Sequence, residues 1–261
     1  MLFILQNINN CDGLVVDISI IKDLIDNSKH SLDKYVFLNN EDFFDNGLLK
    51  NKNEFPKEYE NGIPFGSIEF TTNFLKIFKN IQKMNPIEIP PSLRRYEFLK
   101  REYRILPKDK LPQKGRFFIK NASKLKDGTY ICDIEDLHRE NFFKNNDLYQ
   151  ISDIVNPTSE YRVYVINGKI YAIAYYDGDP CVFPDTSLIQ KANIIYSLQK
   201  DYPKSYTMDV MVTDKGTCIT EIHILLSCGI YQTVLGRNFL FGYDDAIKYL
   251  ERYNTEPIPT E

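Results

Sequence analysis

Residues 206–231 read YTMDVMVTDKGTCITEIHILLSCGIY, and this pattern predicts the β-hairpin around which the chain is organised. Apolar and polar side chains alternate on both sides of the sequence DKG, a short loop that contains glycine. If DKG forms the loop, Thr213 pairs with Thr217, and Asp209 lies directly opposite Glu221. The stretch therefore predicts two carboxylates that face each other on adjacent strands.

A divalent cation would explain why two acids face each other. Carboxylates opposite one another repel unless a positive charge lies between them. His223 follows Glu221 by two residues and therefore points to the same face of its strand. Mg²⁺ is usually held by one or two carboxylates together with substrate phosphates, so Asp209, Glu221 and His223 form a candidate metal site. Two alternatives remain open, because acids on a solvated face need no partner, and a slip of one residue in the loop would separate the pair.

The composition is that of an ordinary soluble protein. Of the 261 residues, 43% are hydrophobic and 26% are charged, which suits one large domain or two smaller ones. The net charge is −4, so no overall positive field favours nucleic acid or an anionic membrane. No apolar run is long enough to span a bilayer, and the start, MLFILQNINNCDG, lacks the features of a signal peptide. We therefore expect a cytoplasmic protein without membrane contact.

The cysteines and histidines do not form a metal motif. Five cysteines lie far apart without a C-x-x-C pair, and three histidines are scattered, which argues against a zinc cluster. Dispersed cysteines in an odd number suit a reducing compartment. Cys228 is a conceivable nucleophile, but no histidine is placed to act as its base, so we do not expect it to be catalytic.

The first 88 residues predict an α/β unit. Two short strands and a helix between them are expected at 2–5, 35–38 and 20–26. Aromatic residues at helical spacing in GSIEFTTNFLKIFKNIQ predict a further helix, for which Ser67 is a suitable N-cap. Prolines at 86, 90 and 91 resist both helix and central strand, and they mark a boundary.

A basic segment follows the prolines. SLRRYEFLKREYR, residues 92–104, predicts a basic amphipathic helix that begins at the N-cap Ser92, and its cations form either a solvated face or ligands for an anion. Next, the strand 116–120 ends in Lys120, and the polar loop NASKLKDG leads to a second strand at 129–132. These two strands form either an ordinary hairpin or a flap whose lysine and N–H groups bind phosphates.

The rest of the chain predicts further strands and covering helices. Asn167-Gly168 between alternating runs is a strong signal for a type I′ hairpin, with Arg162 on the face opposite Tyr161. The other expected elements are a strand at 148–155 and helices at 134–143, 186–202 and 244–253. Together these patterns predict an α+β, or mixed α/β, fold rather than a doubly wound sheet throughout.

Several segments carry a family resemblance. They are IPFGSIEF at 63–70, PSLRRYEFLKR at 91–101, SEYRVYV with GKI in 159–170, and DGDPCVFPD at 177–185. Their order, together with Lys120 at a strand end and the D-V and E-I-H positions of the first hairpin, resembles the ATP-grasp superfamily. Within that superfamily the chain is similar to a small clade whose members are known only as ATP-grasp domain proteins. The likeness extends over roughly residues 62–231.

The resemblance implies an ATP-grasp fold, in which two α+β subdomains hold ATP between them. An N-terminal α/β pre-ATP-grasp domain would occupy residues 1–88, and the ATP-grasp domain would occupy residues 89–261. The two subdomains would be about 89–150 and 151–261. ATP and Mg²⁺ are the implied cofactors, with Mn²⁺ as an alternative to Mg²⁺.

The resemblance also implies roles for individual residues. Lys120 would contact the α- and β-phosphates, and Arg162 would contact the γ-phosphate or the acyl-phosphate, so both are candidates for catalysis. Arg101, with Lys100 and Arg104 as alternatives, would supply a second phosphate-binding cation. The hinge that meets adenine through backbone groups would be Asp153, Ile154 and Val155.

The metal strand departs from the family pattern. Family members usually have E-x-N where this chain has Glu221-Ile222-His223, although Asp209 and Glu221 would still bind the metal. Imidazole suits transition metals better than Mg²⁺, so His223 favours Mn²⁺, bonds a substrate, or marks weakened catalysis. Asn121 also replaces the proline that usually follows the lysine, and the predicted flap contains a single glycine.

Two functions follow from the resemblance. The first is an ATP-dependent carboxylate–amine ligase, which forms an amide or peptide bond through an acyl-phosphate and uses small-molecule or peptide carboxylates and amines. The second is an ATP-binding module with weak or no catalysis that acts through a partner. A nucleic-acid-modifying ligase is not favoured, because no basic stripe extends beyond residues 94–104. The loop 225–232, which follows the metal strand, is expected to face the substrate.

Overall fold

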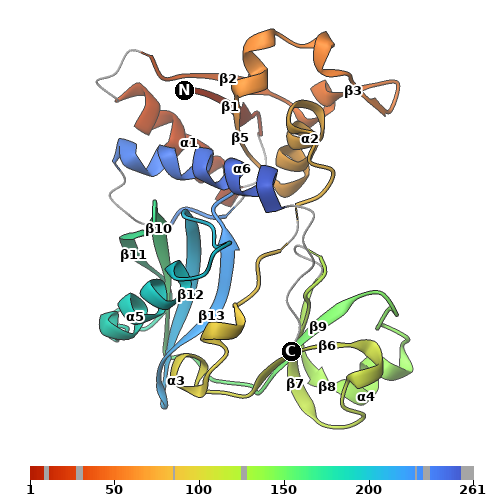
Figure 1. The fold of residues 1–261 in the computed structure, drawn as a ribbon, viewed down its shortest axis with the longest axis vertical. Coiled ribbons are helices and arrows are strands. Elements are labelled where there is room, and N and C mark those ends of the chain that lie inside the picture. Colours follow the sequence, from red (N-terminus) through yellow and green to blue (C-terminus); the bar gives the residue numbers. More distant parts are fainter. Residues whose placement is uncertain are drawn as a thin grey trace.

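The computed structural model describes residues 1–8, 12–27, 32–84, 86–124, 128–226, 228–231 and 236–253. Figure 1 shows an N-terminal unit and, below it, two antiparallel sheets that lie beside each other. We call the sheet with the strand order β11-β10-β12-β13 the central sheet and the sheet with the order β6-β9-β7-β8 the outer sheet. Helices and strands are mixed along the whole chain, so the predicted α+β fold is confirmed.

A parallel sheet in the order β2-β1-β5 forms the centre of the N-terminal unit. The main elements of the unit are β1 (Leu2–Gln6), α1 (Asp12–Asp26), β2 (Lys34–Leu38), β5 (Ile63–Phe65) and α2 (Ile68–Lys79). The short elements between β2 and β5 are η1 (Asn40–Phe43), β3 (Phe44–Asp45), β4 (Leu48–Leu49), η2 (Lys52–Glu54) and η3 (Lys57–Asn61). Ser67 caps α2 as predicted, because its hydroxyl accepts a hydrogen bond from the Phe70 amide at 3.2 Å. The helix expected at 20–26 is the second half of α1.

The basic helix predicted at 92–104 is wrong. The segment contains instead the 3-10 turn η4 (Pro91–Leu93), the one-turn helix α3 (Tyr96–Leu99) and the strand β6 (Tyr103–Pro107). Lys100 ends α3 in the left-handed conformation, with φ 53°. Tyr103 and Ile105 are buried while Arg104 between them is exposed, which is the alternation of a strand. Pairing of β6 with β9 therefore overrides the helical spacing of the apolar residues.

The outer sheet carries the strand that ends near Lys120. Its remaining elements are η5 (Lys108–Lys110), β7 (Arg116–Asn121), β8 (Thr129–Asp133), α4 (Ile134–Arg139) and β9 (Leu148–Ser152). A separate small core, which includes Ile119, Ile134 and Ile151, joins α4 to the sheet. Both α4 and β9 end several residues before the positions expected from the sequence.

The central sheet is built from two antiparallel hairpins. Its elements are β10 (Ser159–Ile166), β11 (Lys169–Gly178), α5 (Thr186–Ser197), β12 (Tyr206–Thr213) and β13 (Gly216–Ile224). Asn167 and Gly168 have φ values of 48° and 74°, as a type I′ turn requires, so the predicted hairpin is confirmed. The helix α5 ends five residues before the predicted end at 202.

One apolar core joins the N-terminal unit to the central sheet. Phe3 and Phe74 of the unit belong to the same buried cluster as Tyr164 of β10 and Tyr243 of α6 (Phe241–Tyr253). Figure 1 shows α6 between the two parts, and a final 3-10 turn, η6 (Arg237–Leu240), precedes it. Val163, which points to the opposite face of β10, belongs to a second core together with α5. None of the helices in the described ranges combines the length and apolar character that a membrane crossing requires.

Candidate functional site

The turn of the central hairpin differs from the prediction. Thr213 pairs with Gly216 rather than with Thr217, so the loop consists of residues 214–215 alone. Taken by itself, this shift of one residue would move the two acids of the hairpin to opposite faces of the sheet.

A β-bulge in β13 compensates for the shifted turn. Val210 pairs with Ile219, whereas the neighbouring Asp209 pairs with Glu221. Thr220 is therefore an extra residue on β13, and it reverses the alternation of the side chains beyond it. As a result, Asp209 lies directly opposite Glu221, as the sequence predicts, although the pairing nearer the turn is different.

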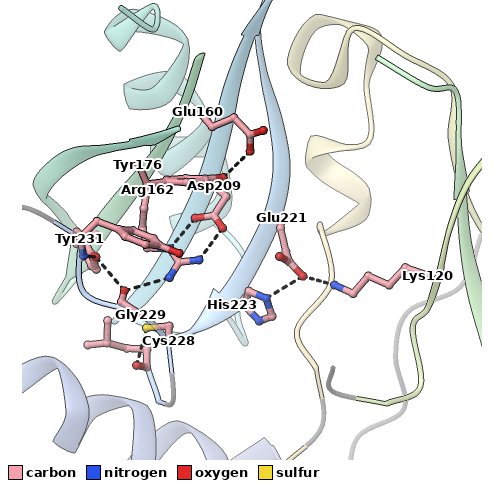
Figure 2. Close-up of polar contacts among 12 residues, drawn as sticks. Lys120, Glu160, Arg162, Tyr176, Asp209, Glu221, His223, Cys228, Gly229 and Tyr231 are labelled. Atoms are coloured by element: carbon pink, nitrogen blue, oxygen red, sulfur yellow. Dashed lines mark hydrogen bonds and ion pairs between the residues drawn. The ribbon is translucent and has the colours of Figure 1, made fainter. Parts of the chain in front are cut away.

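Arg162 of β10 holds Asp209 by two hydrogen bonds. Its Nε and Nη2 atoms donate to the two carboxylate oxygens of Asp209 at 2.8 and 2.7 Å (Figure 2). Its Nη1 atom donates to the Gly229 carbonyl at 3.0 Å, and the guanidinium lies 4.8 Å from the centre of the Tyr231 ring. Burial would lower the pKa of Arg162, but the bonds and charge of Asp209 raise it. The pair is thus ionic and rigidly held.

Glu221 takes part in a second ionic cluster, which joins the two sheets. Lys120 of β7 donates to the Oε1 atom of Glu221, and Nε2 of His223 lies 2.7 Å from the same oxygen (Figure 2). Burial alone would raise the pKa of Glu221, but His223 and Lys120 hold it at about 2. Burial would likewise lower the pKa of Lys120, but Glu88 and Glu221 raise it.

A cavity of about 240 Å³ lies between the two sheets, next to these ion pairs. It is lined by residues of the outer sheet, the hinge and the central sheet, namely Arg101, Phe118, Ile131, Ser152, Asp153, Ile154, Val155, Pro157, Glu160, Met211 and Thr220. Phe118 and Lys120 are two residues apart on β7 and share a face, as do Glu160 and Arg162 on β10. The cavity therefore continues directly into the charged groups, one row further along the strands.

A family model described as an ATP-grasp domain, family 2 of its clade, matches residues 98–236, which is more than half of the chain. The chain belongs to this ATP-grasp family. The match includes the cavity, Lys120 and both strands of the acid pair. No curated protein sequence matches the chain.

Solved structures of ATP-grasp ligases have the same fold. D-alanine–D-alanine ligase from Bacillus anthracis is 14% identical with a TM-score of 0.56, and the alignment covers 96% of this chain and 98% of that one. The same ligase complexed with ATP is 15% identical with a TM-score of 0.50, at the same coverage of both chains. The ATP-grasp ligase PsnB, complexed with a minimal precursor, is 10% identical with a TM-score of 0.51, covering 95% of this chain and 99% of that one.

The predicted nucleotide residues of this ATP-grasp chain lie in two groups. Asp153, Ile154 and Val155 line the cavity, as does Arg101, whereas Lys120 lies in the adjoining charged cluster. The amide of Asp153 donates to the carbonyl of Glu102 at 3.2 Å, which fixes the start of the hinge after β9 ends. The structure therefore brings the predicted hinge and the predicted phosphate lysine to neighbouring parts of one cleft.

Arg101 is anchored to the backbone of the central sheet. Its Nη1 atom donates to the carbonyls of Leu99 and Ile219, both at 3.0 Å, and burial lowers its pKa. Lys100 lies near the turn residue Gly216, and Arg104 is exposed on β6. Arg101 is thus the one of the three candidate cations that lines the cavity, although its bonds to carbonyls already use part of its donor capacity.

The predicted metal ligands Asp209, Glu221 and His223 share a face of the central sheet, but other residues bind them. Arg162 holds Asp209, and Glu221 is shared between Lys120 and His223. In the part of the chain that the structure describes, no three His, Cys, Asp or Glu side chains are grouped closely enough to hold an ion. Both carboxylates retain unused lone pairs, which fit a hard cation that arrives with phosphate oxygens. The ligand set itself stays a prediction.

The loop predicted to face the substrate is partly described. Residues 227 and 232 of the loop 225–232, and residues 125–127 of the predicted flap, lie outside the described residues. Gly229 accepts hydrogen bonds from Arg162 and from the Tyr164 hydroxyl, and the Ile230 amide donates to Asp17 at 2.9 Å. Residues 228–231 therefore connect the charged site to the N-terminal unit.

Cys228 is not suited to nucleophilic catalysis. Its thiol donates to the Leu225 carbonyl at 2.8 Å, and burial raises its pKa to about 11. Little thiolate exists near neutral pH at such a pKa.

Sequence reasoning missed two acids of the site. Glu160 lines the cavity and accepts a hydrogen bond from the Tyr176 hydroxyl at 2.7 Å. Its position two residues before Arg162 would have placed it on the same face. Glu88 acts electrostatically on Lys120, but it lies between prolines in an irregular segment, where no periodicity predicts the direction of a side chain.

Proposed function

We propose that this protein is an ATP-dependent carboxylate–amine ligase, which forms an amide or peptide bond through an acyl-phosphate intermediate. The observation that carries the proposal is the continuity of the cavity with the Lys120–Glu221 and Arg162–Asp209 pairs. A mostly apolar slot that ends in cations suits a nucleotide, whose base is flat and whose phosphates are charged. Membership of the ATP-grasp family and the fold shared with ATP-grasp ligases support the same assignment.

The cavity would bind the nucleoside part of ATP. Phe118 and Met211 come from opposite sheets and provide apolar surfaces for the two faces of a base. Backbone groups of the hinge 153–155 would bind the edge of the base. The carboxylate of Glu160, on the wall nearer Arg162, suits the hydroxyls of a ribose.

Lys120 and Arg162 would bind the phosphates. Because phosphoryl transfer depends on positioning and on neutralising charge, two cations at one end of the slot are the groups that the reaction requires. Mg²⁺, or Mn²⁺ because of His223, would be held by Asp209 and Glu221 and would neutralise further phosphate charge. Lys120 would exchange Glu221 for a phosphate oxygen on binding, whereas Arg162 can keep Asp209 and use its remaining N–H groups.

The proposed reaction has two steps. A substrate carboxylate oxygen attacks the γ-phosphorus, and the bond to the β–γ bridging oxygen breaks, which gives an acyl-phosphate and ADP. An amine nitrogen then attacks the acyl carbon, the amide forms as phosphate leaves with the bonding electrons, and the nitrogen loses a proton. Arg162 is placed to stabilise the charge of the acyl-phosphate. Small-molecule or peptide carboxylates and amines remain the proposed substrates.

We also propose the division into a pre-ATP-grasp domain, residues 1–88, and an ATP-grasp domain, residues 89–261. The outer sheet and its separate core support a first subdomain at about 89–150, and the central sheet supports a second at 151–261. Ser152, at the end of β9, still belongs to the outer sheet, so the hinge follows it.

A second candidate function is an ATP-binding module with weak or no catalysis that acts through a partner. The engagement of Asp209 by Arg162 and of Glu221 by Lys120 and His223 favours this alternative, because both acids already have cationic partners.

Release of ADP and phosphate separates the two functions. The protein is mixed with ATP, Mg²⁺ or Mn²⁺, and pools of amino acids and short peptides, with the Lys120→Met variant as a control. The ligase predicts ADP release that depends on both a carboxylate and an amine and that the variant lacks. ATP binding without ADP release in any pool would support the module, and no binding of ATP at millimolar concentration would contradict both functions.

A further inference from the structure

The linker between the N-terminal unit and β6 carries a buried acid. Glu88 is 9% exposed and lies between Pro86 and Pro90, whose rings restrict the backbone. Its Oε2 atom accepts a hydrogen bond from the Tyr103 hydroxyl at 3.2 Å. Its Oε1 atom is buried and has no hydrogen-bond partner among the described residues. Burying a carboxylate oxygen without a donor costs free energy, so this arrangement calls for a compensating role.

The charges around Glu88 are those of the proposed phosphate site. Burial raises the pKa of Glu88, and the strongest charges acting on it are those of Lys120 and Glu221, with a smaller effect of His223. In return, Glu88 is the strongest charge that raises the pKa of Lys120, ahead of Glu221, to which Lys120 is bonded. One ammonium group therefore has two carboxylates within electrostatic reach and bonds only one of them. Glu88 precedes residue 98, where the family match begins.

We propose that Glu88 is the alternative counter-ion of Lys120, which positions the ammonium group when a nucleotide binds. A cation at Glu221 would repel the ammonium of Lys120, and phosphate oxygens would attract it. With Glu221 no longer available, Glu88 keeps a negative charge behind Lys120 and holds it in the cleft. Glu88 is a positioning residue, since it acts through Lys120. The inference rests on the proposed ATP binding.

The sign of one measurement separates positioning from a simple charge effect. Glu88→Gln keeps the shape of the side chain and removes its charge. If Glu88 were only a negative charge near the phosphates, its removal would leave the affinity for ATP unchanged or increase it. If Glu88 positions Lys120, the Kd of ATP with Mg²⁺ rises about tenfold, the effect expected from one charge-assisted hydrogen bond. The Kd of adenosine, which has no phosphate, stays the same.

Two further variants complete the binding experiment, which is carried out by calorimetry on the full chain. Glu88→Asp keeps the charge and is expected to retain most of the affinity for ATP. Asp109→Asn removes the same charge at an exposed position of η5 and is expected to change neither Kd. An unchanged or lower Kd of ATP in Glu88→Gln would overturn the inference. If Glu88→Gln fails to fold, a Kd in Glu88→Asp that equals the wild-type value for adenosine but is raised for ATP supports the inference, and equal values for both ligands overturn it.

A measurement without nucleotide distinguishes failure of the inference from failure of the proposed function. The side-chain NMR signal of Lys120, assigned by its loss in Lys120→Arg, reports the environment of the ammonium group. We expect it to shift in Glu88→Gln and to stay in place in Asp109→Asn. A wild-type protein that does not bind ATP would contradict the proposed function even where this shift is seen. A wild-type protein that binds ATP, with no shift and no loss of affinity in Glu88→Gln, would contradict the inference alone.

Discussion

The two ion pairs of the cleft are neighbours, but they are built differently. Arg162 and Asp209 lie opposite each other on adjacent strands of one sheet, with two hydrogen bonds and with side chains 9% and 8% exposed. Lys120 and Glu221 come from different sheets, with side chains 14% and 31% exposed, and Glu221 is shared with His223. The register of the central sheet fixes the first pair, whereas the second depends on the distance between two sheets. We infer that the first is part of the scaffold and that a ligand opens the second.

Arg162→Met should have the largest effect on stability. The substitution leaves Asp209 buried and unpaired, and breaking a buried pair in this way costs about 3–5 kcal/mol. Unfolding in urea, followed by circular dichroism, would measure the loss. The double variant Arg162→Met/Asp209→Leu removes both charges and should recover most of the stability. A single variant within about 1 kcal/mol of the wild type would show that the pair is not part of the scaffold.

Lys120→Met should affect binding more than stability. A partly exposed pair contributes about 1 kcal/mol or less to folding, so the unfolding midpoint should change little. Loss of a charge-assisted bond to phosphate costs about 1.5–3 kcal/mol, so the Kd of ATP should rise about ten- to hundredfold. Lys114→Met, at an exposed position before β7, is the matched control and should change neither quantity. Equal weakening of adenosine and ATP binding would indicate a collapsed cleft instead of a lost phosphate contact.

The sequence allowed accurate prediction where local chemistry decides the structure. The cap at Ser67 and the Asn167-Gly168 turn depend on a few adjacent residues, and both are confirmed. The pairing of Asp209 with Glu221 was predicted correctly from an incorrect turn, because the bulge at Thr220 cancels the shift at residues 214–215. Two errors that compensate in this way leave no trace in a pattern of alternating residues.

Tertiary packing decided the features that could not be predicted. The run 92–104 has apolar residues at helical spacing, but Tyr103 and Ile105 also fit the alternation of a strand, and only pairing with β9 selects between them. Glu88 approaches Lys120 because the linker folds back between the units, which no local pattern encodes. The partners of Asp209 and Glu221 were missed as well, since Arg162 and Lys120 were expected to bind phosphates alone.

The smallest expected effect is a pH dependence that arises from the pair between the sheets. The pKa of Glu221 is about 2 in the folded protein against a usual value of 4.5. Between these values the unfolded chain binds a proton that the folded one does not, so the pair stabilises the fold above pH 4.5 and the contribution is lost as the pH falls towards 2. Because Glu221 is partly exposed, we expect a loss of about 1–2 kcal/mol instead of the full value of the shift.

Unfolding in urea between pH 6 and pH 2.5, in the wild type and in Glu221→Gln, isolates this contribution from that of the other acids. The difference in unfolding free energy between the two proteins should shrink as the pH falls, because the amide of the variant has no proton to bind. In a Lys120→Met background the difference should change less with pH, since only His223 then favours the ionised carboxylate. The same pH dependence with and without Lys120 would mean that His223 alone holds Glu221 ionised. In that case the contact between the sheets would store no free energy for a ligand to release, and the distinction between a fixed pair and an opening pair would fail.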